Sequence, residues 1–348
     1  MKTTQKILLA LSGGVDSAVA AALLRDQGHE VIGATLRLLP GAEGDRTEQG
    51  ARRVAAELGL PLHVYDCSTA FAEQVIAPFC HAYREGRTPN PCIQCNRLFK
   101  FGFLLPKLES LGCDCLATGH YVRLAGHGSS LWLRRAVDAR KDQSYFLFTL
   151  RSDQLSRLSF PLGDLTKEQV RQHACELGLA VHEQQESQDV CFVPDNDYIR
   201  LVDETLTQPS PGRIVHVNGR VLGRHAGIHR YTIGQRRGLG IAWSEPLYVV
   251  RLDAALNHVI VGEQSELLRQ QLEVDGLVWH ESFFAKTGGT ADVSCQIRYR
   301  HRPVPAQVER LDGGQARVTL ASAQSGITPG QAAVFYRDDL VIGGGWIR

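Results

Sequence analysis

The first 200 residues alternate short apolar runs with amphipathic stretches of helical period. The apolar runs with strand character are KILLAL (6–11), HEVIGATLRL (29–38), PLHVYDCS (61–68) and DCLATGHYVRL (114–124). Between them, RTEQGARRVAAELGL places Ala51, Val54, Ala55 and Leu58 on one face of a helix. TKEQ at 166–169 is a capping-box pattern that begins a later helix. Strands that alternate with helices of this length predict βαβ units and a parallel sheet.

The pattern changes near DETLTQPSPGR, at residues 203–213. The segments that follow are short, alternate apolar with polar positions and are punctuated by glycine, which predicts β-structure. We expect an α/β fold class: a Rossmann-like parallel-sheet domain over residues 1–202, a small central β-rich domain over 203–264, and an all-β barrel-like domain over 265–348.

Composition and charge exclude several classes of protein. Of the 348 residues, 43% are hydrophobic and 22% are charged, as in ordinary globular proteins with a core. No apolar run approaches the length of a membrane span, so we expect no membrane partner. The formal net charge is only +1, so a nucleic acid would have to bind local basic patches.

Cysteine usage indicates the compartment. The apolar run near the N-terminus is too short for an export signal and is followed by Asp16. Nine cysteines without an export signal indicate a reducing compartment, so we expect a cytoplasmic protein with free, catalytic or metal-bound thiols. We expect the isolated cysteines to be small buried hydrophobic residues: Cys67, Cys80, Cys113, Cys115 and Cys175.

A glycine loop follows the first strand. In SGGVDS (12–17), Gly13 and Gly14 can adopt backbone angles that other residues avoid, and the following helix offers N–H groups to a phosphate. Ser12 and Ser17 add hydroxyl donors. Asp16 would repel phosphate unless Mg²⁺ lay between them, which hints at a metal-nucleotide complex. No Lys-Ser or Lys-Thr follows the glycines, so the loop is not a Walker A motif.

This loop resembles the signature of the ATP-pyrophosphatase superfamily, and further motifs narrow the resemblance. The chain is similar over nearly its whole length to the bacterial tRNA-specific 2-thiouridylase family, which replaces the C2 oxygen of the wobble uridine with sulfur. The motifs are TPNPCIQCNRLFKF (88–101), TGHYVR (118–123), KDQSYFL (141–147), SQDVCF (187–192), HRYTIGQRRGLG (229–240), CQIRYRH (295–301) and GITPGQAAVFY (326–336).

The resemblance implies ATP as cofactor and tRNA as partner, with the Lys, Glu and Gln acceptors as the expected tRNA set. It implies ATP contacts at Ala10, Leu11, Ser12, Gly13, Gly14, Val15, Asp16, Ser17, Leu36 and Gly119. It implies tRNA contacts at His120, Lys141, Asp142, Gln143, Arg298, Tyr299 and Gln331. Asn90, Pro91 and Cys92 would surround the target base. Three basic runs, 140–151, 229–237 and 298–302, are in keeping with an RNA surface.

Two distant cysteines match the family pattern. Cys95 would be the catalytic nucleophile and Cys191 the persulfide carrier, loaded by a cysteine desulfurase or a sulfur-relay protein. One thiol can release sulfur from the other by thiol–disulfide-type exchange, which would leave a catalytic disulfide between them.

Cys92 departs from the family, because many members carry an Asp there that could act as a general acid or base. Cys92, Cys95 and Cys191 could instead ligate an iron–sulfur cluster, since three thiolates with an open fourth position suit one better than a closed structural zinc site. There are two rival interpretations. One is a synthetase of the same superfamily with a small-molecule acceptor, and the other is a non-catalytic RNA-binding protein with a relict nucleotide fold. The cysteine pair argues against both.

Overall fold

The computed structural model describes residues 4–127, 131–179, 190–193, 197–206, 210–280 and 289–348. The chain forms two compact units whose segments interleave along the sequence. Unit 1 comprises residues 1–75, 92–188 and 337–342, and unit 2 comprises residues 76–91, 189–336 and 343–348. Among the described residues, no helix is both long and apolar enough to cross a membrane.

Unit 1 is built on a five-stranded sheet in the order β3-β2-β1-β4-β7, and every neighbouring pair is parallel. Its strands are β1 (Lys6–Ala10), β2 (Glu30–Arg37), β3 (Leu62–Asp66), β4 (Cys115–Thr118) and β7 (Leu158–Ser159). The central strands are buried on both faces, as expected when helices cover a parallel sheet.

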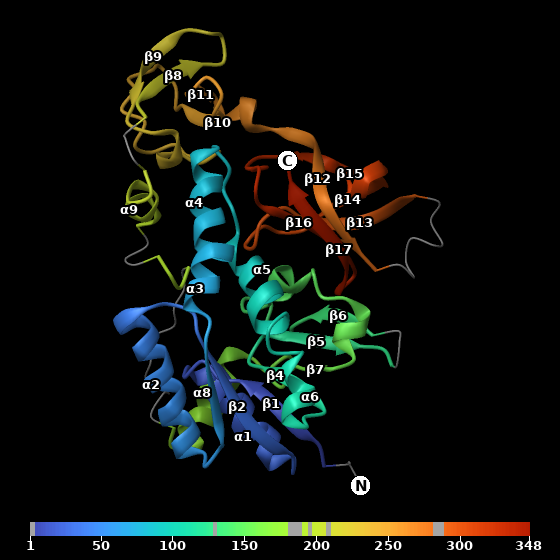
Figure 1. The fold of residues 1–348 in the computed structure, drawn as a ribbon. Coiled ribbons are helices and arrows are strands. Elements are labelled where there is room, and N and C mark those ends of the chain that lie inside the picture. Colours follow the sequence, from blue (N-terminus) through green and yellow to red (C-terminus); the bar gives the residue numbers. More distant parts are fainter. Residues whose placement is uncertain (1–3, 128–130, 180–189, 194–196, 207–209, 281–288) are drawn as a thin grey trace. The chain divides into compact units, whose positions relative to one another are not determined.

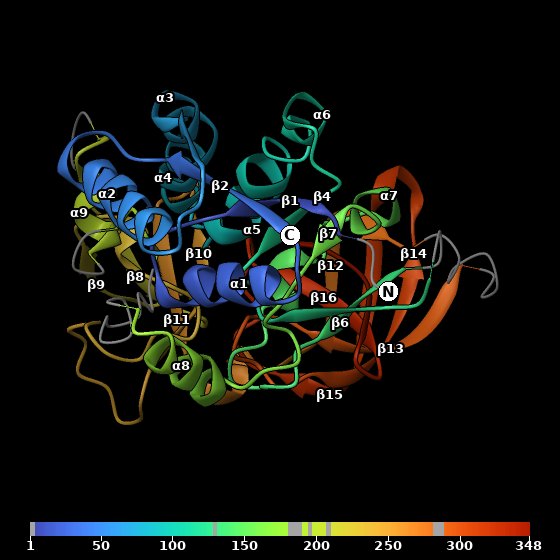
Figure 2. The same cartoon turned by 90° about the horizontal axis from the view of Figure 1, so that it is seen from below.

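Helices surround this sheet (Figure 1). They are α1 (Val15–Asp26), α2 (Gly41–Glu57), α3 (Ser68–Phe71), α5 (Pro91–Cys95), α6 (Lys107–Leu111), α7 (Ser152–Leu155) and α8 (Lys167–Glu176). Helix α1 packs against α8, and α2 lies against β2 (Figure 2). A hairpin of β5 (Val122–Ala125) and β6 (Trp132–Arg135) completes the unit and pairs with Leu340 of β17.

Unit 2 begins with α4 (Ala77–Arg84), which packs against α9 (Tyr198–Asp203) through stacked Tyr83 and Tyr198 rings 4.3 Å apart. A four-stranded sheet follows in the order β10-β11-β8-β9. Its strands are β8 (Gly212–His216), β9 (Val221–His225), β10 (Tyr248–Asp253) and β11 (His258–Gly262). The small core of this sheet includes Val249, Val259 and Val261.

The last six strands form an antiparallel barrel. They are β12 (Arg269–Trp279), β13 (Thr290–Gln296), β14 (Val304–Arg310), β15 (Ala316–Gln324), β16 (Ala332–Arg337) and β17 (Leu340–Ile347). Strand β12 pairs with both β15 and β17, so the sheet closes on itself and leaves no open edge there. Cys295 lies in the barrel core, where burial raises the pKa of its thiol to about 12.

The predicted fold class is confirmed, with the parallel sheet first, the small β domain next and the barrel last. The capping box is also confirmed, because Thr166 and Gln169 bond each other's backbone N–H groups. The prediction for Cys175 was wrong: this residue is exposed on α8, while Cys67, Cys80, Cys113 and Cys115 are buried. The domain boundaries after residues 202 and 264 stay a prediction.

Candidate functional site

The glycine loop connects β1 to α1 in unit 1. Gly13 has φ of +79°, and a Cβ atom there would lie 2.5 Å from the backbone of Gly50, so glycine is required for both angle and space. Gly14 has an ordinary φ of −91° as the N-cap of α1, so the prediction of an unusual angle was wrong there. The hydroxyls of Ser12 and Ser17 lie 3.2 Å apart, which places two small donors beside the helix N-terminus.

An ion pair between a buried lysine and a half-buried aspartate lies at this loop. The Asp16 Oδ1 atom accepts hydrogen bonds of 2.7 Å from the Lys167 ammonium and from the Tyr121 hydroxyl. The Lys167 side chain is only 6% exposed and is the first residue of α8. Asp16 therefore shares one carboxylate oxygen with an ammonium, and the Mg²⁺ expected beside this residue stays a prediction. The arrangement also places a lysine beside the phosphate-binding loop.

The carboxyl ends of neighbouring parallel strands bring other predicted ATP residues to this edge. Leu36 lies near the end of β2 and Gly119 directly follows β4, and both strands pair with β1. Gly119 touches the loop, since a Cβ atom there would be 3.0 Å from the backbone of Asp16 and Ser17. The crevice at the carboxyl edge of such a sheet is where ligands bind.

The segment 141–143 is held against the same edge. Gln143 Oε1 accepts from the Tyr121 N–H, and the Gln143 N–H donates to the Tyr121 carbonyl. Asp142 is buried and accepts from Arg135 and Ser144, so its carboxylate organises the loop. Lys141 is partly exposed. The tRNA contacts expected of this segment stay predictions, and the geometry favours Lys141 over Asp142.

His120 is buried between polar neighbours. Its Nδ1 lies 2.8 Å from the Thr118 hydroxyl, and its Nε2 lies 3.4 Å from the Lys100 ammonium. Burial, and then the Lys100 charge, lower the pKa of His120 well below its usual value, so the ring is neutral at pH 7. A neutral, buried imidazole can donate one hydrogen bond, but it cannot supply a cation to a phosphate.

The first two cysteines of the candidate set lie on α5, three residues apart. Cys92 is half-buried and Cys95 is 8% exposed. The next six residues, Asn96–Phe101, form a π-helical segment, a form that often occurs at functional sites. In the described part of the chain, Gln94 Oε1 and Asn96 Oδ1 are buried without a hydrogen-bond partner. Buried acceptors of this kind call for an explanation, and a bound ligand is one.

Cys191 belongs to unit 2, whereas Cys92 and Cys95 belong to unit 1. Cys191 is exposed, and the next residue, Phe192, is 5% exposed and packs edge-on against Phe79 of α4 at 5.2 Å. The buried ring fixes the chain while the preceding residue is exposed. Ser187, Gln188 and Asp189 of the same motif lie outside the described residues.

Gln331, expected near the target base, binds the segment that leads into α5. Its Nε2 donates to the Thr88 carbonyl at 2.9 Å, and the Thr88 N–H donates to the Pro329 carbonyl at 2.8 Å. Gly330 lies between them with φ of +91°, and a Cβ atom there would be 3.0 Å from the Thr88 oxygen. The barrel domain therefore binds the chain at Thr88, two residues before Asn90.

Arg298 and Tyr299 lie just after β13. The buried Gln296 amide donates to both their carbonyl oxygens, at 3.2 and 2.5 Å, and so fixes this turn. The Arg298 side chain is exposed and lies against Gly326, where a Cβ atom would approach its Nη1 to 2.8 Å. An exposed cation next to an aromatic ring on a fixed turn suits RNA, and both contacts stay predictions.

Several residues of the site were missed by the sequence analysis: Lys167, Tyr121, Gln94, Asn96, Thr88 and Gln296. The sequence pattern does place Lys167 at the start of a helix with a capping box, which is a weak indication of a special role. Nothing in the sequence indicates its partner, because Asp16 lies 151 positions away. Gln94 and Asn96 flank Cys95 in the motif already singled out, so adjacency could have found them.

Comparison with known proteins gives three family models that together span the chain. The models are a tRNA methyl transferase HUP domain over residues 5–195, a tRNA methyl transferase PRC-barrel domain over 200–263, and an aminomethyltransferase beta-barrel domain over 269–347.

Curated relatives match over the full length. The chain is 50% identical to a tRNA-specific 2-thiouridylase of Syntrophotalea carbinolica, over 100% of both chains. It is 49% identical to a protein of the same name from Trichlorobacter lovleyi, over 99% of this chain and 97% of that one. A solved U34-tRNA thiolase of Methanococcus maripaludis is 18% identical to this chain, with a TM-score of 0.36, and the match covers 59% of this chain and 65% of that one. This likeness is too weak to carry an argument about this chain.

Replacement of Lys167 by Ala should lower ATP-dependent pyrophosphate release about 10²- to 10³-fold, the usual effect of losing one charge-stabilising group. The affinity for tRNA, measured by filter binding, should change less than about twofold. Lys107→Ala is the matched control, because this lysine lies over the Tyr65 and Phe103 rings, away from the loop. Wild-type pyrophosphate release by the Lys167→Ala protein would refute a role for the ammonium at the phosphates.

Replacement of Gln331 by Leu should lower the kcat of the tRNA reaction about 2- to 10-fold, the value of one hydrogen bond, with little change in the KM for tRNA. The reason is that the lost bond holds Thr88 ahead of α5. Gln307→Leu, at an exposed position of the same barrel, serves as control. A raised KM with unchanged kcat would instead make Gln331 a direct tRNA contact.

Proposed function

This chain belongs to the tRNA-specific 2-thiouridylase family, and we propose that it replaces the C2 oxygen of the wobble uridine of tRNA with sulfur, at the expense of ATP. One observation in the structure supports this most strongly. The glycine loop with its Lys167–Asp16 pair, the segment 141–143 and the π-helical segment after Cys95 all belong to unit 1 and share contacts through Tyr121 and His120. Nucleotide, base and thiol chemistry would therefore meet at one edge of the parallel sheet.

The first half-reaction is adenylation. The uridine C2 oxygen attacks the α-phosphorus of ATP, the bond to the β-phosphate breaks, and pyrophosphate leaves. The N–H groups at the start of α1 and the hydroxyls of Ser12 and Ser17 would hold the phosphates. Lys167 would offset the charge that develops there, while Asp16 and Tyr121 hold its ammonium in place. AMP is then a far better leaving group than the original carbonyl oxygen.

The second half-reaction delivers sulfur. The Cys95 thiolate attacks the inner sulfur of a persulfide on Cys191, which forms a Cys95–Cys191 disulfide and releases hydrosulfide. The hydrosulfide attacks C2, and AMP leaves with the former C2 oxygen. A thiol reductant must then supply two electrons and two protons to reopen the disulfide. The exposed position of Cys191 supports its loading by a donor protein, and the buried position of Cys95 supports release of sulfide away from water.

An iron–sulfur cluster on Cys92, Cys95 and Cys191 is the alternative. Cys92 and Cys95 lie three residues apart on α5, so both thiols can reach one ligand. A cluster would bind a sulfide at its open position, and free sulfide would then replace the persulfide donor. The persulfide route is favoured because Cys95 and Cys191 match the family pattern whatever residue stands at position 92.

The proposed partners are the tRNAs for Lys, Glu and Gln, together with a cysteine desulfurase or a sulfur-relay protein. The proposed compartment is the cytoplasm, where thiols stay reduced. The five buried cysteines outside the candidate set support this, because burial raises the thiol pKa at each of them and makes it inert: Cys67, Cys80, Cys113, Cys115 and Cys295.

Loss of this protein should remove 2-thiouridine derivatives from the wobble position of cellular tRNA and leave other thionucleosides in place. Nucleoside mass spectrometry of tRNA from a deletion strain measures this directly. A strain complemented with the intact chain is the control. Persistence of wobble 2-thiouridine in a strain without a second copy of the enzyme would contradict the proposed function.

Cysteine variants should separate the two sulfur routes. With persulfide chemistry, Cys95→Ser and Cys191→Ser each abolish thiolation, Cys95→Ser still accepts ³⁵S from a desulfurase on Cys191, and Cys92→Ser keeps substantial activity. With a cluster, anaerobically prepared protein contains iron and acid-labile sulfide, and each of the three replacements loses them. Cys175→Ser is the control, because it removes an exposed thiol outside the candidate set. Iron-free protein that turns over with Cys92 replaced would exclude the cluster.

A further inference from the structure

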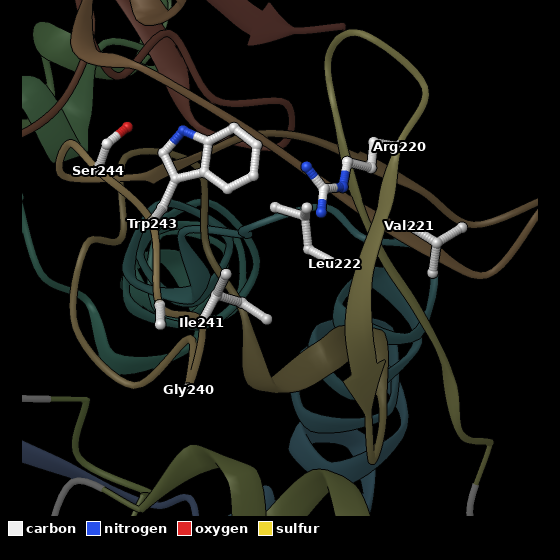
Figure 3. Close-up of a pocket in the computed structure, with 8 residues that line it drawn as sticks. Arg220, Val221, Leu222, Gly240, Ile241, Trp243 and Ser244 are labelled. Carbon is white, nitrogen blue, oxygen red and sulfur yellow. The ribbon is translucent and has the colours of Figure 1, made fainter.

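The small central sheet of unit 2 carries an open cavity of about 800 Å³. It lies between the start of β9 and the loop 240–244, so it is formed by this domain alone (Figure 3). Its lining residues are Arg220, Val221, Leu222, Gly240, Ile241, Ala242, Trp243 and Ser244. None of these residues belongs to the thiolation site described above.

Two groups that stack on planar ligands border the cavity. The guanidinium carbon of Arg220 lies 5.6 Å from the centroid of the Trp243 ring and is turned toward it in Figure 3. The buried His216 ring stacks on Trp243 at 4.9 Å and so fixes the indole. A planar group held between Trp243 and Arg220 needs about 7 Å, two contact distances of about 3.5 Å. The exposed Arg220 side chain would open this gap by moving outward by about 1 Å.

The wall between these groups is apolar and anchored. Leu222 and Ile241 pack against the core of the central sheet, as does Trp243 itself. Val221 is 52% exposed, high for an aliphatic side chain on a strand. A fixed apolar wall beside a stacking pair suits a flat ring more than a flexible chain.

Polar groups for the edge of such a ring are available in the loop. Among the hydrogen bonds of the described residues, none involves the backbone of residues 240–244. Ser244 adds an exposed hydroxyl at the end of the loop. Backbone N–H and C=O groups and a hydroxyl can bond both donor and acceptor edges of a nucleobase.

The positive charge around the cavity indicates which kind of molecule carries the planar ring. Residues 210–250 contain six arginines, no lysine, and Glu245 as the single acidic residue, a net charge of +5 in a chain whose total is +1. Arg230 is paired with Asp203, but the other five arginines are exposed. The cavity thus opens in the most basic part of the chain, which complements a polyanion.

We propose that this cavity binds an unpaired nucleobase of the tRNA substrate, stacked on Trp243 and covered by Arg220, with the neighbouring arginines on the phosphates. The proposal rests on the proposed function, because it takes tRNA as the ligand. It adds a second RNA contact, on the central domain. A side chain of a sulfur-donor protein is the other conceivable occupant, and the charge and the flat stacking pair favour RNA.

The test uses the full chain and an unmodified tRNA transcript with a wobble uridine. Trp243→Ala, Trp243→Phe and Arg220→Ala are compared with Leu256→Ala, which removes an exposed apolar side chain of the same domain outside the cavity. Affinity is measured by filter binding over a range of salt concentrations, and folding by thermal unfolding. Tryptophan fluorescence is titrated with tRNA in the wild type and in Trp243→Phe.

Trp243→Ala should bind the transcript about 5- to 100-fold more weakly, the range for loss of one stacked base, with an unchanged salt slope. Trp243→Phe should keep most of the affinity and lose most of the tRNA-induced quenching, and it stays informative if Trp243→Ala fails to fold. Arg220→Ala should weaken binding and lower the salt slope by about one at most. Leu256→Ala should bind as the wild type does.

Wild-type affinity of Trp243→Ala, with the same quenching in the wild type and Trp243→Phe, would overturn the proposal while thiolation by the wild type still upheld the function. Unchanged tRNA affinity with slower sulfur transfer from a desulfurase would assign the cavity to the donor protein and also overturn it. A wild-type chain that fails to thiolate any tRNA in the parallel assay would refute the proposed function itself.

Discussion

The carboxyl edge of the parallel sheet in unit 1 is organised around one ion pair, Lys167 with Asp16. Lys167 begins α8 and Asp16 lies in the first turn of α1, and the Tyr121 hydroxyl adds the segment after β4 to the same carboxylate oxygen. A buried ammonium is tolerated only with a partner of opposite charge in good geometry. The pair therefore fixes the starts of both helices relative to the sheet, and the phosphate loop, Gly119 and the segment 141–143 take their positions from elements that it joins.

The candidate cysteines belong to different parts of the chain. The break between the two compact units falls between Pro91 and Cys92, in the first turn of α5. Upstream, Thr88 is held by Gln331 and Pro329 of the barrel domain; downstream, Asn96 donates to the Phe146 carbonyl within unit 1. The segment with Cys92 and Cys95 is thus held at both ends by groups far away in sequence. The barrel contacts the chain shortly before these two cysteines, and the proposed effect of Gln331 on kcat depends on that contact.

Much of the fold could be predicted from the sequence because its signals are local. The alternation of strands and helices, the capping box at Thr166 and the left-handed angle at Gly13 each depend on a few adjacent residues. The residues that the sequence did not indicate depend instead on partners far away in the chain. The Lys167 ammonium bonds Asp16, 151 positions away, and the Gln331 amide bonds Thr88, 243 positions away. Gly14 was assigned an unusual angle, yet its φ of −91° is ordinary, and a Cβ atom there would contact only the Ser12 hydroxyl, at 3.7 Å, so neither backbone angle nor space within the chain requires glycine.

The basic segment 210–250 carries its positive charge on arginine alone. A guanidinium stays protonated at every pH at which the protein folds, and it is not a substrate for lysine acetylation. The attraction of this domain for a polyanion is therefore a fixed property of the chain, which cellular pH and acyl-donor levels do not alter. Control of RNA binding through lysine acetylation would then have to act outside this segment.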